Sequence, residues 1–201
     1  MQKLLIATSN PGKVGEYRAQ LADLNLELVS LADLGLGSIE ETGKNFEENA
    51  LLKARTYFKQ SGLPCIADDG GLEIDALGGE PGVRSRRWKT GNENVTDQEL
   101  IDFTLEKMRE VPKEKRTARL RLVMAFIDGE GAEHVTEAAV EGLIADAPAQ
   151  NKIEGFPFRA VLYIPRFNKM YDDLTHEEHD AVNQRVVAIK KLKPIIAKAQ
   201  V

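Results

Sequence analysis

Two adjacent aspartates, Asp68 and Asp69, follow directly after the apolar run at residues 63–66. This run is typical of the end of a buried strand. Carboxylates are almost never fully buried unless they are paired or bind a metal ion. Gly70 and Gly71 come next and leave the backbone open to close approach. The stretch therefore predicts either a site for a hard divalent cation, which prefers oxygen ligands, or a solvated turn.

The composition is that of an ordinary globular protein, with 42% hydrophobic and 29% charged residues among 201. We expect a single domain over residues 1–201, with one sizeable core and one or two lobes. The net charge of −5 argues against a general nucleic-acid binder or a membrane-surface protein. Cys65 is the only cysteine in the sequence, which excludes an internal disulfide and fits a reducing cytoplasm. No apolar run is long enough to span a membrane.

Strand and helix patterns alternate along the chain. Continuous or alternating apolar residues predict strands at 3–8, 26–30, 116–128, 133–144 and 160–164. Capping signals predict helices that follow the turn at 9–13 to about 22, and that cover 45–61, 96 to about 111 and 175 to about 198. This alternation, with a hairpin of the two long central strands, indicates an α/β fold on a mixed sheet.

The turn between the first strand and the first helix carries polar groups. Thr8, Ser9 and Asn10 place hydroxyl and amide groups next to the free N–H groups of a helix start, and Lys13 lies in the first turn. Helix N-termini favour anions, and a lysine adds a positive charge for phosphate. Ordinary helix capping explains Ser9 and Asn10 equally well, so both interpretations stay open.

Asn49 and Lys53 lie on or beside the apolar face of the predicted helix at 45–61. Lys53 either extends its ammonium group to solvent or serves a cleft, and Asn49 one turn earlier favours the cleft. Just before this helix stand Glu40 and Glu41. A carboxylate there is either another oxygen ligand for a metal ion or a favourable acid ahead of a helix N-terminus.

Two further segments suggest ligand binding. Residues 78–89 form a glycine-proline turn followed by four basic residues, which suits either a polyanion such as a triphosphate or a solvated charged surface. Near the C-terminus, Phe156 and Phe158 lie in a loop before a strand. Their rings either stack on a base or belong to the core.

Taken in order, these segments resemble the inosine triphosphate pyrophosphatase family, enzymes that hydrolyse damaged purine nucleoside triphosphates. The family pattern T-S/G-N-x-G-K-x-x-E corresponds to residues 8–16. The pattern E-E-T-G-x-x-F-x-E-N-A-x-x-K-A corresponds to residues 40–54, and A-D-D-S-G-L-x-V-D-A-L-G-G-x-P-G-V-x-S-A-R to residues 67–87. The resemblance covers nearly the whole chain.

The resemblance implies an elongated mixed β-sheet flanked by helices, two lobes with a central cleft, and a homodimer. It implies that the product pair is a nucleoside monophosphate and pyrophosphate. Glu40 and Asp69 would bind Mg²⁺, and Asp69, with Asp68, would orient or deprotonate the attacking water. The implied substrate-binding residues of the first half are Thr8, Ser9, Asn10, Lys13, Asn49, Lys53, Gly70 and Arg87.

The C-terminal block departs from the family pattern. Where the family has G-F-G-Y-D-P, this chain keeps the phenylalanine as Phe156 but has Arg159 at the aspartate position. The family's S-H-R becomes residues 183–185, with Gln184 in place of histidine. Lys169 and Arg185 are retained, and Gly70 replaces the usual serine or threonine beside the metal site. Replacing an acid by a cation inverts hydrogen-bond donors and acceptors, so we expect an altered base preference.

Three functions follow from these features. The first is Mg²⁺-dependent hydrolysis of non-standard purine nucleoside triphosphates of the ITP, dITP and XTP type, in the cytoplasm and without nucleic acid or membrane partners. The second keeps this chemistry but shifts or relaxes the base specificity. The third is a non-catalytic nucleotide-binding protein, which the many retained charges argue against.

Overall fold

The protein, described here by a computed structural model for residues 2–91 and 95–199, is built on one seven-stranded mixed sheet. The strand order is β2-β1-β3-β4-β5-β6-β7, with β1 parallel to β2 and β3, and β6 antiparallel to β5 and β7. The predicted α/β class with a mixed sheet is confirmed. The strands are β1 (Gln2–Ile6), β2 (Leu26–Ser30), β3 (Cys65–Ile74), β4 (Thr117–Ile127), β5 (Glu133–Ile144), β6 (Leu162–Ile164) and β7 (Lys169–Met170).

The chain divides into two compact units, and the long strands β3, β4 and β5 pass from one into the other. Unit 1 comprises Met1–Asp69, Leu122–Ala138 and Gln184–Val201, and unit 2 comprises Gly70–Arg121 and Ala139–Asn183. Each unit has a hydrophobic core of its own. The helices are α1 (Pro11–Gln20), α2 (Phe46–Ser61), α3 (Asp97–Met108), α4 (His176–Val182) and α5 (Gln184–Lys198). The central cleft implied by the resemblance stays a prediction.

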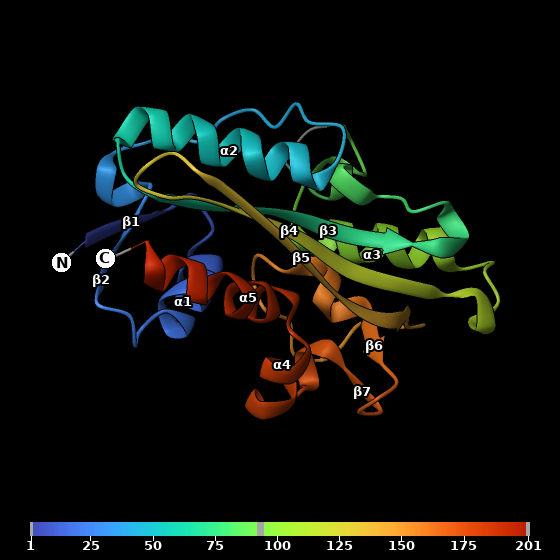
Figure 1. The fold of residues 1–201 in the computed structure, drawn as a ribbon. Coiled ribbons are helices and arrows are strands. Elements are labelled where there is room, and N and C mark those ends of the chain that lie inside the picture. Colours follow the sequence, from blue (N-terminus) through green and yellow to red (C-terminus); the bar gives the residue numbers. More distant parts are fainter. Residues whose placement is uncertain (1, 92–94, 200–201) are drawn as a thin grey trace. The chain divides into compact units, whose positions relative to one another are not determined.

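In unit 1, α1 and α5 cover one face of the strands and α2 lies on the other face (Figure 1). The alternation along β4 explains this arrangement, because successive side chains of a strand point to opposite faces. Every second side chain of β4 in unit 1 packs with the helices α1 and α5, whereas the buried side chains between them point to the opposite face, which α2 covers. The first set includes Leu122, Met124 and Phe126, and it packs with Tyr17, Leu21, Ile189 and Leu192.

Helix α2 begins and ends where the sequence predicts. The Asn45 side chain accepts a hydrogen bond from the Glu48 amide at 2.8 Å and so caps the N-terminus. Gly62 ends the helix in the left-handed conformation at φ 68°, which glycine adopts without steric cost. Asn49 is 0% exposed on the buried face of this helix. A buried amide needs hydrogen-bond partners, and this requirement gives α2 its place in the candidate site.

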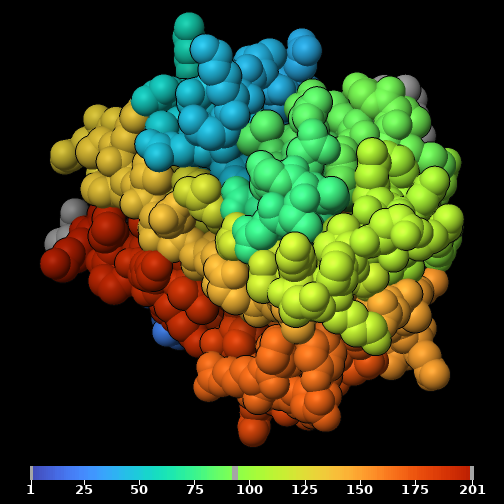
Figure 2. Space-filling model, turned by 90° about the vertical axis from the view of Figure 1, so that its right-hand side faces the viewer, coloured from blue at the N-terminus to red at the C-terminus, as the bar shows by residue number. Residues whose placement is uncertain are grey.

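In unit 2, helix α3 packs against η5, a short 3₁₀ segment at Pro157–Val161. Both halves of the predicted capping box between Thr96 and Glu99 are present at the start of α3. All five residues of η5 are buried, whereas yellow-green and orange parts of the chain lie side by side on the face that Figure 2 shows. The core beneath them includes Leu72, Ile74, Leu100, Ile101, Leu120, Val161 and Leu162.

Three predictions about local structure are wrong. Strand β3 runs from Cys65 to Ile74, so Asp68 and Asp69 lie within a strand and not in a turn after one. The final helix is divided at Asn183, whose ψ of 114° is extended, into α4 and α5. The predicted strand at 160–164 begins only at Leu162, because η5 continues to Val161. Within the described residues, no helix is long and apolar enough to cross a membrane.

Candidate active site

The two aspartates of β3 point to opposite faces of the strand and meet different partners, all within unit 1. Successive residues of a strand alternate between faces. Asp68 therefore shares a face with α1 and α5, and Asp69 shares a face with α2. The pair creates two environments from two neighbouring residues.

Asp68 lies among hydrogen-bond donors from two helices. Its carboxylate accepts hydrogen bonds from the Tyr17 hydroxyl at 2.8 Å, the Lys13 Nζ at 2.9 Å and the Arg185 Nη2 at 3.1 Å. Arg185 also donates to Glu16. Burial alone would raise the pKa of Asp68, but the charges of Arg185 and Lys13 outweigh burial and hold this pKa well below its usual range. Asp68 is therefore ionised at any physiological pH and is a weak base.

Asp69 lies in a contrasting environment. Its Oδ2 accepts a hydrogen bond from Asn49 Nδ2 at 2.9 Å, and its Oδ1 lies 3.9 Å from Lys53 Nζ. Burial raises the pKa of Asp69, the charge of Lys53 opposes this change, and the negative charge of Glu41 adds to it. A carboxylate with a raised pKa accepts a proton more readily. Of the two aspartates, Asp69 is therefore the one suited to act as a base.

Lys53 links two carboxylates. Its Nζ lies 2.5 Å from Glu41 Oε1, and its side chain is only 12% exposed. Burial would lower the pKa of Lys53, but Asp69 and Glu41 together raise it, so the ammonium group stays charged. The lysine thus serves a site and does not extend to solvent, which was the alternative interpretation. Glu41 and Asp69 share one cation.

Asn49 joins Asp69 to the loop before α2. Its Oδ1 accepts a hydrogen bond from the Gly43 amide at 2.7 Å while its Nδ2 donates to Asp69. A Cβ atom at position 43 would lie 2.5 Å from Asn49 Oδ1 and 2.8 Å from the Asn49 backbone nitrogen. Only glycine allows this approach. The structure therefore places Asn49 as a support for Asp69, a role that the sequence analysis did not give it.

The structure favours Glu41 over Glu40 as the second carboxylate of the site. Glu40 is exposed, whereas Glu41 is half-buried and pairs with Lys53 beside Asp69. The physical reason is the loop conformation between residues 40 and 43, which sequence spacing does not reveal. Among residues 2–91 and 95–199, no three acidic, histidine or cysteine side chains come together as a ready metal site.

The turn before α1 adopts the ordinary capped conformation. Asn10 Oδ1 accepts hydrogen bonds from the amides of Gly12 and Lys13, and the Asn10 amide donates to Thr8 Oγ1. Ser9 is exposed. Capping does not exclude phosphate binding, because a helix N-terminus still presents its dipole to an anion. The ammonium group of Lys13, held by Asp68, adds positive charge from the first turn of this helix.

The basic segment of unit 2 is mostly neutralised by carboxylates. Three of its four basic side chains form ion pairs, namely Arg84 with Glu80, Arg86 with Asp97 and Lys89 with Glu99. Arg87 is half-buried at the end of a 3₁₀ segment, η3 (Gly82–Arg87). The segment therefore offers less free positive charge than its composition indicates.

The remaining candidates of unit 2 form an aromatic and charged cluster. The Arg159 guanidinium lies 3.8 Å from the centroid of the Phe156 ring and 5.2 Å from that of Tyr171. Arg159 is 4% exposed. Lys169 Nζ donates to both carboxylate oxygens of Glu178, at 2.9 and 2.7 Å. Phe158 is buried, so the core interpretation holds for this ring.

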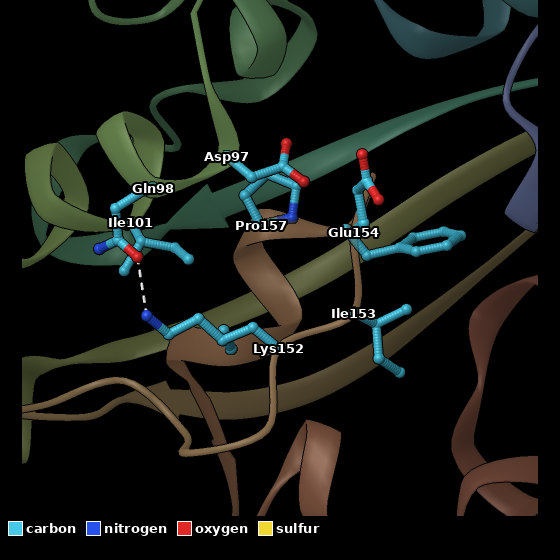
Figure 3. A pocket seen from close by; sticks show the side chains of 9 residues that line it. Asp97, Gln98, Ile101, Lys152, Ile153, Glu154 and Pro157 are labelled. Atoms are coloured by element: carbon cyan, nitrogen blue, oxygen red, sulfur yellow. Dashed lines mark hydrogen bonds between the residues drawn. The ribbon is translucent and has the colours of Figure 1, made fainter.

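Phe156 also lines a hollow of about 220 Å³ in unit 2. Figure 3 shows this hollow between the first turn of α3 and the loop that carries Lys152, Ile153 and Glu154. Lys152 reaches across to the Gln98 side chain at 2.7 Å. Ile101, Pro157 and Ala160 add apolar surface. The hollow presents an aromatic ring beside polar side chains, a lining common in small-molecule sites.

Two candidates lie at unit boundaries. Gln184 is buried at the start of α5, and its Oε1 has no hydrogen-bond partner among the described residues. Gly70 continues β3 directly after Asp69 and is half-buried. A buried amide oxygen without a donor is costly, which is consistent with a ligand donor at Gln184.

Sequence reasoning missed Tyr17, Glu16 and Tyr171 among these residues, and it named Glu41 as a possible ligand but assigned the role to Glu40. A signal for Tyr17 existed, since it lies four residues after Lys13 and therefore on the same helix face. Glu16 is part of the quoted motif at 8–16 but was not assigned a role. For Glu41 and Tyr171, no local pattern distinguishes them from their neighbours.

The comparisons with known proteins concern the whole chain. A model described as the Ham1 family matches residues 4–195. A protein named dITP/XTP pyrophosphatase from Salmonella typhimurium is 41% identical over 194 residues, covering 96% of each chain. Its namesake from Escherichia coli is 40% identical over 194 residues, with the same coverage. The structure of a HAM1 protein from Coxiella burnetii has a TM-score of 0.86 and 32% identity, and covers 98% of this chain and 100% of its own.

Proposed function

The chain belongs to the Ham1 family and is a nucleoside triphosphate pyrophosphatase, and we propose that it converts non-standard purine nucleoside triphosphates of the ITP, dITP and XTP type to the monophosphate and pyrophosphate. The observation that carries the proposal is the pair of neighbouring aspartates with contrasting partners: Asp68 is bound by Lys13, Tyr17 and Arg185, whereas Asp69 is supported by Asn49 beside Lys53. Such a division is what a phosphate-cleaving site requires of its anchor and its base.

The donor set fits Mg²⁺. Mg²⁺ is usually bound by one or two carboxylates together with substrate phosphates and waters, and not by an all-protein cage. Glu41 and Asp69 supply two such carboxylates beside one lysine. We assign them as the ligands in place of the Glu40 and Asp69 pair first predicted. When bound, Mg²⁺ would neutralise phosphate oxygens and make nearby water more acidic.

The reaction follows from the roles of the protein groups. A water molecule attacks the α-phosphorus, the bond to the bridging oxygen breaks, and pyrophosphate leaves. Asp69, oriented by Asn49, takes the proton of the attacking water at its carboxylate. Lys13, Lys53 and the capped N-terminus of α1 stabilise negative charge on the phosphates. Most of the rate enhancement then comes from positioning and electrostatics, as in other phosphoryl transfers.

Asp68 is the anchor of this site. Its three donors bring Lys13 of α1 and Arg185 of α5 to a fixed position beside β3. Because its pKa lies well below the usual range, it does not compete with Asp69 for the proton of water. We therefore assign Asp68 to organising the cations and Asp69 to proton transfer.

We assign base recognition to Phe156, Arg159, Lys169, Gln184 and Arg185. Gly70 and Arg87 are assigned as further substrate-binding residues. A shifted base preference is the second candidate function, and the packing of Arg159 on Phe156 favours it. The guanidinium places donors where the related pattern has an acid, so a base edge with acceptor atoms is preferred. The homodimer and the cytoplasmic location stay predictions.

Pyrophosphate release from a panel of ITP, dITP, XTP, GTP and ATP, with Mg²⁺ or with EDTA, tests the proposal. We expect turnover of the first three with Mg²⁺ and a loss of at least ~10²-fold in kcat for Asp69→Asn, because a general base contributes about 10²–10⁴-fold. The substitution Asp102→Asn, on the exposed side of α3, is the control. Nucleotide binding without hydrolysis under every condition would support the non-catalytic alternative and refute the proposal.

A further inference from the structure

Asp172 is a buried carboxylate without an evident structural purpose. It lies in η6 (Tyr171–Asp173) of unit 2. Both of its carboxyl oxygens are inaccessible to solvent, and neither has a donor in full hydrogen-bond geometry among the residues that the structure describes, although the backbone N–H of Ile153 lowers the pKa of this carboxyl group. A buried acceptor without a donor costs roughly 1–3 kcal/mol, and a charged one costs more. A side chain kept at such a cost calls for an explanation beyond packing.

Three neighbours act on the Asp172 carboxyl group: the positive charge of Arg159 and the backbone N–H of Ile153 lower its pKa, and the negative charge of Asp173 raises it. The guanidinium of Arg159 stacks on Phe156 at 3.8 Å and lies near the ring of Tyr171, the residue before Asp172. The two ring contacts and the attraction of a nearby negative charge together restrict the orientation of this planar cation. Phe156 and Arg159 therefore behave as one stacked unit, with Asp172 as its counter-charge.

The ionisation of Asp172 runs against the stability of the fold. Burial raises the pKa of Asp172 to about 6, against the opposing charge of Arg159. A carboxyl group with a raised pKa binds its proton more tightly in the folded than in the unfolded state. The fold is therefore relatively more stable below pH 6 than above it, as far as this group is concerned. At neutral pH the ionised Asp172 destabilises unit 2.

We propose that Asp172 is a positioning residue for base recognition, whose ionised carboxyl group holds the stacked Phe156–Arg159 unit in the orientation that contacts the nucleobase. The proposal rests on the proposed function, which gives Phe156 and Arg159 to the base. It explains why a destabilising charge is placed behind these two side chains. Asp172 acts through Arg159 and does not itself take part in the hydrolysis.

The other charged groups near this cluster have partners of their own. Lys169 is paired with Glu178. His179 lies edge-on to Tyr171 at 5.4 Å and contacts Asn183. Asp173, the direct neighbour, is exposed. Because Asp173 directly follows Asp172 and carries the same charge but is not buried, Asp173→Asn is a matched control.

The test compares Asp172→Asn with Asp173→Asn in the full chain, by ITP hydrolysis from pH 5 to 8.5 and by thermal unfolding. We expect Asp172→Asn to raise KM for ITP at pH 7.5 by about tenfold, as for a charge–charge interaction without a direct hydrogen bond, with kcat changed far less. The wild-type KM rises as the pH falls through about 6, and this step is absent in Asp172→Asn. The melting temperature of Asp172→Asn exceeds that of the wild type at pH 7.5 and approaches it at pH 5.

A double variant shows whether Asp172 acts through Arg159. Arg159→Lys keeps the charge but loses the planar, stacked guanidinium. If Asp172 acts through it, adding Asp172→Asn to Arg159→Lys raises KM little further, whereas independent residues give multiplied effects. A purely structural role predicts the opposite stability change, namely a lower melting temperature for Asp172→Asn at pH 7.5.

Two outcomes overturn the proposal: a wild-type KM and pH profile in Asp172→Asn, or equal effects of Asp172→Asn and Asp173→Asn. If the wild type hydrolyses no triphosphate, the proposed function fails separately. In that case the same variants are compared by calorimetric titration with ITP in EDTA. A wild-type dissociation constant for Asp172→Asn then refutes the positioning role by itself.

Discussion

Replacing Glu41 by glutamine removes one negative charge from the candidate site and keeps the size of the side chain. Glu41 pairs with Lys53 at 2.5 Å, and Lys53 lies 3.9 Å from Asp69. After Glu41→Gln, Lys53 has only Asp69 as a charged partner in this group. The substitution therefore changes both the proposed metal ligands and the balance of charge around the base.

The structure sets the size of the expected effects. Breaking a fully buried ion pair costs about 3–5 kcal/mol. The Glu41 side chain is 25% exposed and Lys53 retains Asp69, so we expect a loss of only about 1–2 kcal/mol in unfolding free energy. Turnover should suffer more. Losing a group that stabilises developing charge costs about 10²–10³-fold in kcat, and the Mg²⁺ concentration for half-maximal rate should rise.

Glu40→Gln is the control, since Glu40 is the adjacent residue, carries the same charge and is exposed. Pyrophosphate release is measured at a series of Mg²⁺ concentrations, and urea unfolding gives the stability of each variant. We expect Glu40→Gln to keep wild-type turnover, because its charge is far better solvated. If Glu40→Gln alone impairs turnover and its Mg²⁺ dependence, the ligand is Glu40 and our use of the loop geometry is refuted.

Two further predictions concern the supports of the site. Asp68→Asn leaves the buried Arg185 short of a counter-charge and should lower the unfolding free energy at pH 7.5 by about 3 kcal/mol in urea titrations. Because the pKa of Asp68 is lowered, the contribution of this carboxylate to stability is full above about pH 4 and is lost as the pH falls further. A stability difference between variant and wild type that changes between pH 8 and 5 would contradict this. Gly43→Ala should displace Asn49 and reduce kcat by about tenfold, whereas Gly37→Ala, where a Cβ atom meets nothing within 4 Å, serves as control and should leave kcat unchanged.

The sequence predicts best what is decided within a few residues. The starts of α2, α3 and α4 follow from capping residues at Asn45, Thr96 and Thr175, and each cap is present. A cap joins a side chain to an amide three residues away, so the signal and its partner lie in one short segment. The same locality explains why the α/β class was predictable from alternating patterns.

The sequence proposes members of the candidate site but not their arrangement. The apolar run at 63–66 suggested that the strand ends before Asp68 and Asp69, and no counter-charge stands near them in sequence. The structure supplies these charges from 55 positions away in Lys13 and 117 positions away in Arg185. Sequence separations of this size carry no local signal, so β3 continues where the sequence predicts a turn. The choice between Glu40 and Glu41 likewise depends on the loop conformation, which has no local sequence signal, and Glu40 as ligand stays a prediction.

Three buried aspartates differ in what neutralises them, and this difference determines what each can do. Asp68 receives donors from three side chains, so its charge stabilises the fold and its basicity is lost. Asp69 shares Lys53 with Glu41 and keeps a raised pKa, so its basicity is available. For Asp172, the charge of Arg159 and the backbone N–H of Ile153 do not outweigh burial, so its ionised form lowers stability. Because Asn for Asp removes the charge at similar volume, the three substitutions should change stability in different directions: downward at Asp68, little at Asp69, upward at Asp172.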